Sequence, residues 1–418
     1  MANVEIDGVN SKVYTDQVDP KTGTTLTLGT SGDTVSVPSG VTIANSGTAT
    51  GFGITQTSFL PTAQPLIING DTAIATRSTS VASITGSGYN TCDRWKVGMS
   101  SAGTWTQTQS TDVPSGSGFG TSFKMDCTTA DASLGAGDWI AIIYNFEGQD
   151  LQLIKKGTAS AEKMTLAFWI KSTKTGTFIA NLYDNDNTRQ CSISYTVDVT
   201  NTWEKKIVNL PADTTGAFGN DNALSLSIYF WLGAGSNYTS GSLGTTWAAY
   251  SAATTAVGQV NCADSTSNDV LITGVQMEVG EYTSSDLPPF RHESYGANLA
   301  RCQRYFNIFG NVASKPMGMA AFNTASAVYV GPLTYPVEMR SSPTIAITGG
   351  GGGEEATAGF VINHSGVNDW FQTFSSSDTS TKECQLYASA EVSATDGDAG
   401  RCKTGNIEFG KIEADAEI

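Results

Sequence analysis

Alternating apolar and polar positions dominate the middle of the chain. Residues 164–171, 178–182 and 224–230 place a large apolar side chain at every second position. Successive side chains of a strand point to opposite faces, so each run predicts a strand with one buried face. Lys174-Thr175-Gly176 separates the first two runs and predicts a hairpin. Together with Gly-, Asn- and Asp-rich turns, the pattern predicts a jelly-roll-like β-sandwich over residues 61–293.

A different pattern follows this domain. Residues 270–279 alternate as a strand, and Pro288-Pro289 then stops regular structure. The chain's clearest amphipathic helix begins after Ser294, a suitable N-cap, with Leu299 and Cys302 on its apolar face. This face continues to Tyr305 or Phe306. We expect this short helix to link two domains and to offer its apolar face to the next domain or to neighbouring subunits.

The sequence pattern of the C-terminal part, residues 294–418, predicts the linking helix followed by a second β-sandwich. Five consecutive glycines, Gly349 to Gly353, predict a mobile loop. Short β-like runs surround this loop. They cover residues 317–322, 327–330, 343–347, 359–363, 370–374, 385–392 and 406–412. The predicted fold class is therefore all-β, with two sandwiches and one short helix.

The N-terminal residues 1–60 are nearly free of large apolar groups. They contain only short alternating pairs, such as Leu26 with Leu28 and Val35 with Val37, split by turns. Such pairs are too short to cover a core within one chain. Two interpretations follow: a shaft in which several copies wind together, or a disordered linker.

Composition and charge narrow the classes of partner. Charged residues make up 15% of the 418 residues, and 39 acidic against 23 basic side chains give a net charge of −16. This balance argues against nucleic acid, because binding a phosphate backbone needs clustered Lys and Arg. No run approaches the ~20 apolar residues of a membrane helix, so we expect no membrane insertion. Seven scattered cysteines without a C-x-x-C pair predict buried free thiols, as in a protein assembled in a reducing cytoplasm.

Several segments resemble one group of proteins. The stretch GVQMEVGEYTSSDLPPFRHESYGANLARCQRYF (274–306) resembles a segment that recurs in tail-fibre and other virion-appendage proteins of bacteriophages. MTLAFWIKSTKTGTF (164–178) and NTWEKKIV (201–208) look like members of the same family, and GDTVSVPSGVTIANSGTATGFG (32–53) resembles N-terminal segments of marine-phage fibres. The resemblance implies a body domain like a carbohydrate-binding module. It also favours the ordered shaft for residues 1–60.

No assembled catalytic site can be read from the chain. Its two histidines, His292 and His364, lie in a linker motif and a turn, and no G-x-S-x-G elbow is present. The acidic residues offer many pairs for glycan hydrolysis, but the sequence singles out none. We therefore expect no enzymatic activity, no catalytic residues and no cofactor, with a glycan hydrolase as an alternative.

Binding residues can be suggested more directly. Sugar binding needs exposed aromatic rings beside amides and carboxylates. Asp184 and Asp186 could ligate a structural calcium ion, although the loop is not an EF-hand and a solvated hairpin tip is the simpler interpretation. The candidate glycan-binding residues are Trp370, Asp369, Asn368 and His364 in the C-terminal domain, and Trp231 and Tyr238 in the larger domain.

These observations predict a phage fibre protein that adheres to a host-surface glycan or protein. Residues 1–60 would attach a homotrimer to other virion proteins, and the C-terminal domain would face the host. The protein would be assembled in the host cytoplasm and exposed on the outside of the particle. The alternative functions are a structural spacer or decoration without receptor contact, and a fibre-borne glycan hydrolase.

Overall fold

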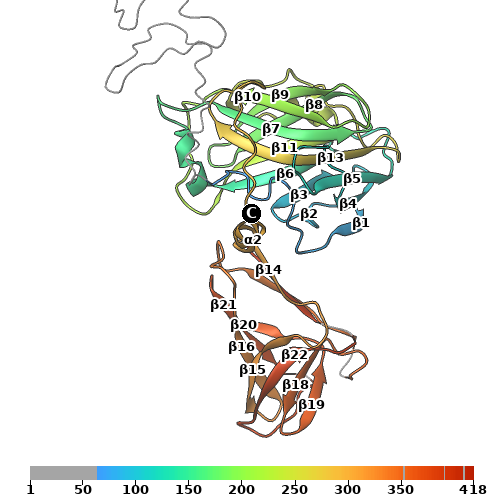
Figure 1. Ribbon diagram of the computed structural model, residues 1–418, viewed down its shortest axis with the longest axis vertical. Coiled ribbons are helices and arrows are strands. Elements are labelled where there is room, and N and C mark those ends of the chain that lie inside the picture. The colour runs from blue at the N-terminus through green and yellow to red at the C-terminus, as the bar shows by residue number, and fades with distance from the viewer. Residues whose placement is uncertain (1–63, 352–353, 390, 408–409) are drawn as a thin grey trace, which may run out of the picture. The chain divides into compact units, whose positions relative to one another are not determined.

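The computed structural model describes residues 64–351, 354–389, 391–407 and 410–418. The predicted shaft, residues 1–60, lies outside the described residues. Within them the chain is mostly β and forms two sandwiches of antiparallel sheets with few short helices, which confirms the predicted fold class (Figure 1). None of the described helices is long and apolar enough to cross a membrane.

The first sandwich consists of two antiparallel sheets. In spatial order, the six-stranded sheet contains β1 (Ser80–Ile84), β4 (Thr104–Ser110), β5 (Ser122–Thr129), β13 (Asp269–Val279), β7 (Met164–Ser172) and β10 (Glu204–Leu210). The seven-stranded sheet contains β12 (Ala248–Ala249), β9 (Arg189–Val197), β8 (Gly176–Asp184), β11 (Leu224–Ala234), β6 (Trp139–Glu147), β3 (Trp95–Ser100) and β2 (Gly88–Tyr89). The short helices of the first sandwich are η1 (Gly148–Ile154), α1 (Ser236–Thr239) and η2 (Ala252–Thr254). The chain changes sheet repeatedly, as in a jelly roll.

The predicted alternation within strands is confirmed. Phe168 of β7 and Phe230 of β11 lie in the core between the sheets, with ring centroids 5.0 Å apart. The predicted hairpin at Lys174-Thr175-Gly176 is wrong, because β7 and β8 belong to opposite sheets. Both strands have one strongly apolar face, and placing them in different sheets lets each face cover the same core from its own side.

The second sandwich pairs a large sheet with a small one. The seven-stranded sheet contains β19 (Val367–Phe371), β18 (Phe360–His364), β22 (Ala399–Thr404), β15 (Pro316–Thr324), β16 (Ala327–Thr334), β21 (Glu383–Ala388) and β20 (Ser375–Thr379). The three-stranded sheet contains β14 (Phe306–Gly310), β23 (Lys411–Asp415) and β17 (Thr344–Thr348). Strands β14, β20 and β22 were not predicted. The predicted strand at 370–374 begins three residues late relative to β19.

Two residues of the glycine run at 349–353, Gly349 and Gly350, lie against neighbouring backbone. A Cβ atom at Gly349 would lie 1.4 Å from the carbonyl oxygen of Gln372, and one at Gly350 would lie 1.7 Å from that of Thr357. These two glycines are therefore required by close approach of neighbouring backbone. The described part of the run, residues 349–351, is irregular, as a loop would be, and its mobility stays a prediction.

Helix α2 (Tyr295–Gln303) begins as predicted, with the Ser294 side chain accepting a hydrogen bond from the Ala297 amide. The partner of its apolar face differs from the expectation. Cys302 and Tyr305 are buried together with Ile68 and Ile74, at the start of the first sandwich. The helix thus packs on the domain that precedes it.

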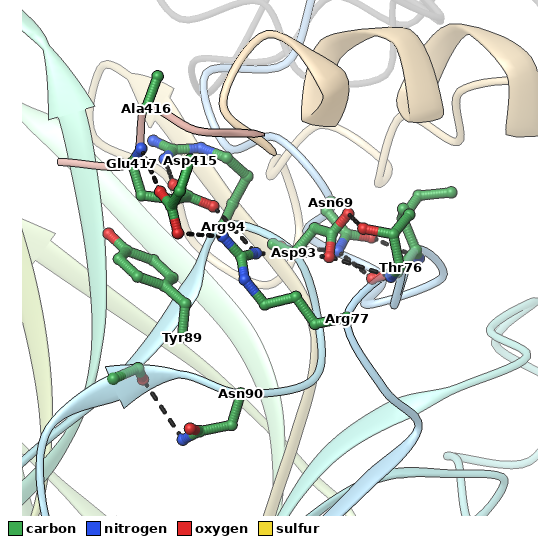
Figure 2. Close-up of polar contacts among 12 residues, drawn as sticks. Asn69, Thr76, Arg77, Tyr89, Asn90, Asp93, Arg94, Asp415, Ala416 and Glu417 are labelled. Atoms are coloured by element: carbon green, nitrogen blue, oxygen red, sulfur yellow. Dashed lines mark hydrogen bonds and ion pairs between the residues drawn. The ribbon is translucent and has the colours of Figure 1, made fainter. Parts of the chain in front are cut away.

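The last residues of the chain contact the first sandwich through buried charges (Figure 2). Arg94, 1% exposed, pairs with Glu417, and its guanidinium lies over the Tyr305 ring, 3.4 Å from the centroid. Arg77 contacts the same carboxylate at 3.4 Å and Asp415 at 3.2 Å. The Glu417 carboxylate thus contacts two arginines, and these ion pairs and the cation–π contact join the two sandwiches through the end of the chain.

All seven cysteines are free and buried, which confirms the sequence-based expectation. Five of them, Cys92, Cys191, Cys262, Cys302 and Cys402, have no exposed surface.

Candidate functional site: an aromatic cleft on the first sandwich

The outer face of the seven-stranded sheet of the first sandwich carries a cavity of about 280 Å³, here named the aromatic cleft. Six of its eight lining residues are aromatic. The lining consists of Trp139, Asn181, Tyr183, Tyr229, Trp231, Tyr238, Tyr250 and Thr255. Ligand cavities of a few hundred Å³ with aromatic walls and a few polar groups are typical small-molecule sites.

Strand alternation brings most of these side chains to one face. In β11, Ile228 and Phe230 point into the core, so Tyr229 and Trp231 point outward. Asn181 of β8 lies directly opposite Tyr229 in the antiparallel register. Side chains on the same face of paired strands are neighbours, which places the amide beside the two aromatic rings.

Trp139 extends the aromatic surface across β6 toward β3. Its ring centroid lies 5.7 Å from that of Trp231. A Cβ atom at Gly98 of β3 would lie 2.8 Å from the Trp139 ring, so any larger residue would push the indole away. Gly98 therefore lets the tryptophan lie over the neighbouring strand.

The opposite wall comes from the long connection between β11 and β13. Tyr238 of α1 is held by a hydrogen bond from the Ala256 amide to its carbonyl, at 2.9 Å. The amide of Tyr250 donates to the Thr188 carbonyl at 2.9 Å, and its ring contacts Tyr183 edge to face at 5.2 Å. Backbone hydrogen bonds to neighbouring loop and turn residues thus hold both tyrosines in place.

The cleft offers hydrogen-bonding groups that the protein leaves unused. The indole N–H of Trp231, a residue 4% exposed, has no acceptor within the described residues. The amide nitrogen of Asn181 donates to Ser192 Oγ at 2.9 Å and to the Cys191 carbonyl at 3.4 Å, which orients its side chain. Buried polar groups are normally paired, and the Trp231 nitrogen is an exception with almost no accessible surface. The polar groups of the cleft that a ligand can reach are therefore the tyrosine hydroxyls and the Asn181 carbonyl oxygen.

The cleft is electrically neutral. Among the residues that the structure describes, its lining contains no Asp, Glu, Lys, Arg or His. Burial raises the pKa of Tyr229, and burial together with the nearby tyrosines raises the pKa of Tyr250. Both phenols therefore stay protonated at neutral pH and can donate as well as accept hydrogen bonds.

Two of the sequence-predicted site residues meet in this cleft. Trp231 and Tyr238 lie with ring centroids 5.4 Å apart. The other lining aromatics and Asn181 were missed, although outward positions of the same alternating runs, such as Tyr183 and Tyr229, carried a readable signal. Trp139 could not be found this way, since its position depends on Gly98 of a distant strand.

The structure divides the second predicted cluster between the two faces of the β18–β19 hairpin. His364 is buried, and its Nε2 lies 3.1 Å from Asp369 Oδ2 while its ring packs on Phe322. Asn368 is exposed and Trp370 half-buried, one residue to either side of Asp369 in the strand, so they face away from it. None of the four lines the aromatic cleft.

The predicted solvated hairpin tip is wrong for Asp184, which is fully buried. The Lys156 ammonium contacts Asp184 at 2.5 Å and Asp213 at 3.0 Å. It also donates to the carbonyls of Thr215 at 3.0 Å and Gly216 at 2.7 Å. The Asp184 carboxylate, suggested as a calcium ligand, therefore binds the ammonium of Lys156 from the same chain.

Asp186, the second suggested calcium ligand, is exposed and accepts a hydrogen bond from the Gly219 amide at 2.9 Å. Among the described residues, no three His, Cys, Asp or Glu side chains gather as a metal site would require.

Comparison with known proteins shows distant structural similarity only. No protein-family model matches the chain, and no curated protein matches it in sequence. The enzymatically active domain of tailspike protein 4 from bacteriophage CBA120 is similar at 16% identity and a TM-score of 0.28. That match covers 51% of this chain and 21% of the tailspike chain, about a fifth of its length.

Two carbohydrate-binding modules are similar at the same level. A family 4 module matches at 14% identity and a TM-score of 0.23, covering 44% of this chain and 94% of the module. The family 11 module of the cellulosomal cellulase Lic26A-Cel5E of Clostridium thermocellum matches at 13% identity and a TM-score of 0.23, covering 48% and 99%. At these scores the similarity is distant and assigns no family.

Proposed function

We propose that the chain is a bacteriophage fibre protein that adheres to a host-surface glycan through the aromatic cleft of its first sandwich. The observation that carries this proposal is the cleft itself: six aromatic residues and an oriented amide around a cavity of about 280 Å³. Sugar rings present apolar C–H faces and a rim of hydroxyls. Aromatic walls cover the faces, while unpaired donors and acceptors bind the rim.

The virion assignment is supported by the sequence resemblance of residues 274–306 and 164–178 to phage fibre proteins. In this proposal residues 1–60 attach the protein to other virion components, three copies assemble, and the glycan sites lie on the outside of the particle. Several weak sites on one particle then bind a densely glycosylated surface tightly.

The proposed role is adhesion without catalysis. Glycoside hydrolysis requires two carboxyl groups on either side of the scissile bond. The lining of the aromatic cleft contains no carboxylate. Release of reducing ends from a bound glycan by the purified protein would instead support the hydrolase alternative.

The test is binding of the full-length protein to an array of bacterial oligosaccharides, followed by affinity measurement for the best ligands. Tyr238→Ala and Tyr250→Ala each remove one wall of the cleft while leaving the core between the sheets intact. We expect each to weaken binding at least about tenfold, equivalent to about 1.4 kcal/mol. Tyr295→Ala, at a residue 66% exposed on α2, is the matched control and should bind normally.

The same assay separates the alternatives. Trp370→Ala tests the C-terminal candidate residues, and a loss of binding in this variant alone would move the site to the second sandwich. Wild-type protein that binds no glycan on the array, and no intact host cell, would favour the spacer.

A further inference from the structure

Two charged side chains next to the aromatic cleft already contact other parts of the chain. Arg189 pairs with Ala249 at the edge of the sheet, close in sequence to Tyr250. Its guanidinium is held in a bidentate contact by Asp213, at 2.9 and 3.0 Å. Asp138, which precedes Trp139, accepts a hydrogen bond from the Gly135 amide at 2.7 Å. The cation of the two, Arg189, is therefore already paired with a carboxylate and cannot serve as counter-ion for a ligand.

A negatively charged ligand would therefore find no counter-ion in the cleft. Moving a carboxylate from water to a site without a cation costs several kcal/mol, because its hydration is lost and nothing replaces it. The chain as a whole carries a net charge of −16, which repels a polyanion before contact.

Hydroxyl groups face no such cost. The phenol groups of Tyr229 and Tyr250 are neutral partners for sugar hydroxyls. Asn181 commits its amide nitrogen to Ser192 and Cys191, and its carbonyl oxygen accepts no hydrogen bond within the described residues. Donors and an acceptor thus lie on one face of two paired strands.

We infer that the aromatic cleft selects uncharged sugar units and rejects uronic acids, sialic acids and phosphorylated sugars. The inference rests on the proposed glycan binding and adds the class of glycan. It identifies the receptor as a neutral stretch of host polysaccharide, bound by ring stacking and hydroxyl contacts.

The test compares matched pairs of oligosaccharides that differ only in oxidation at C6, such as β-1,4-linked mannan with β-1,4-linked polymannuronate. We expect the full-length protein to prefer the uncharged member of the pair it recognises by at least about tenfold. Its affinity should be unchanged between about 0.05 M and 0.5 M sodium chloride, since no ion pair forms.

A gain-of-function variant sharpens the test. Tyr250 is 42% exposed at the rim, so Tyr250→Arg adds a cation without burying it. We expect this variant to acquire salt-sensitive binding of the acidic member of the pair. Tyr295→Arg adds the same charge on α2 and should not acquire it.

The outcomes separate this inference from the proposed function. Wild-type protein that binds acidic members as well as neutral ones, or better, overturns the selectivity and leaves glycan binding intact. Wild-type protein that binds neither class overturns the proposed function, and the selectivity with it.

Discussion

Asp93 is a buried carboxylate of the first sandwich, and burial disfavours its charged form. Asp93 has no exposed surface and accepts hydrogen bonds from the Thr76 amide at 3.1 Å and the Thr76 hydroxyl at 2.6 Å. Arg77 approaches it only to 3.7 Å. Burial outweighs these partners and raises the pKa of Asp93 to about 6. The folded protein thus holds this proton more tightly than the unfolded chain does.

The first prediction concerns the pH dependence of stability. Because the folded pKa of Asp93 exceeds the ordinary value of 3.8, the favourable contribution of its protonation is present below that value and is lost as pH rises through about 6. Asp93→Asn removes this loss. We expect the free energy of unfolding of the variant, relative to wild type, to improve between pH 4 and pH 7 by up to about 3 kcal/mol. Urea unfolding at both pH values measures it, and a constant difference would contradict the argument.

At the scale of elements, the Lys156 ammonium holds β8 to the 211–219 loop. It is surrounded by two carboxylates and two carbonyl oxygens, with its side chain 1% exposed. Burial alone would raise the pKa of Asp213, but hydrogen bonds from Arg189 and Lys156 outweigh it and lower that pKa. The ion pair therefore stabilises the fold at neutral pH and weakens in acid.

The second prediction concerns a variant, Lys156→Ala, that lacks this ammonium. Lys156→Ala leaves Asp184 and Asp213 buried without their shared cation, and should cost about 3–5 kcal/mol of unfolding free energy. Millimolar calcium should restore part of the loss in the variant and leave wild type unchanged, because the four oxygens are ligands that calcium accepts. Thermal unfolding with and without calcium checks both points.

The control for this variant is Lys155→Ala. Lys155 pairs with Glu162 on the surface, where both side chains are well exposed. Such a pair contributes at most about 1 kcal/mol. Equal losses of unfolding free energy from the two lysine variants would show that the buried ion pairs of Lys156 stabilise the fold no more than the surface pair of Lys155.

The third prediction concerns the end of β23. Glu417→Gln removes the negative charge next to Arg94, which is 1% exposed. A buried guanidinium without its carboxylate should cost about 3–5 kcal/mol. We expect calorimetry to show a lower melting temperature and limited proteolysis to cut faster between the sandwiches. Glu413→Gln, which affects a more exposed pair with Lys411, should leave both measurements near wild type.

At the scale of the whole molecule, the proposed trimer remains a prediction from the N-terminal residues. If copies wind together through residues 1–60, the full-length protein should sediment at roughly three times its 43.8 kDa chain mass. Sedimentation velocity over a range of concentrations measures this. A stable monomer at all concentrations would remove both the shaft and the multivalent adhesion that depends on it.

Local regularities of the chain were readable from sequence, and long-range pairings were not. Alternation placed Phe168 and Phe230 in the core because it depends on neighbours in one strand. The assignment of β7 and β8 to different sheets, the burial of Asp184 by Lys156, and the packing of Cys302 on Ile74 each depend on residues far apart in sequence. The aromatic cleft was readable in part. Alternation within the strand predicts that Tyr229 points outward, but it does not predict that Trp139 lies in the same cleft.

The buried free thiols provide reporter groups distributed through the molecule. Cys191 and Cys262 lie in the first sandwich, Cys302 on α2, and Cys402 in the second sandwich. Burial raises the pKa of each, so none reacts as a thiolate while its surroundings stay closed. Alkylation rates mapped by mass spectrometry would therefore measure how often each region opens, without any introduced label.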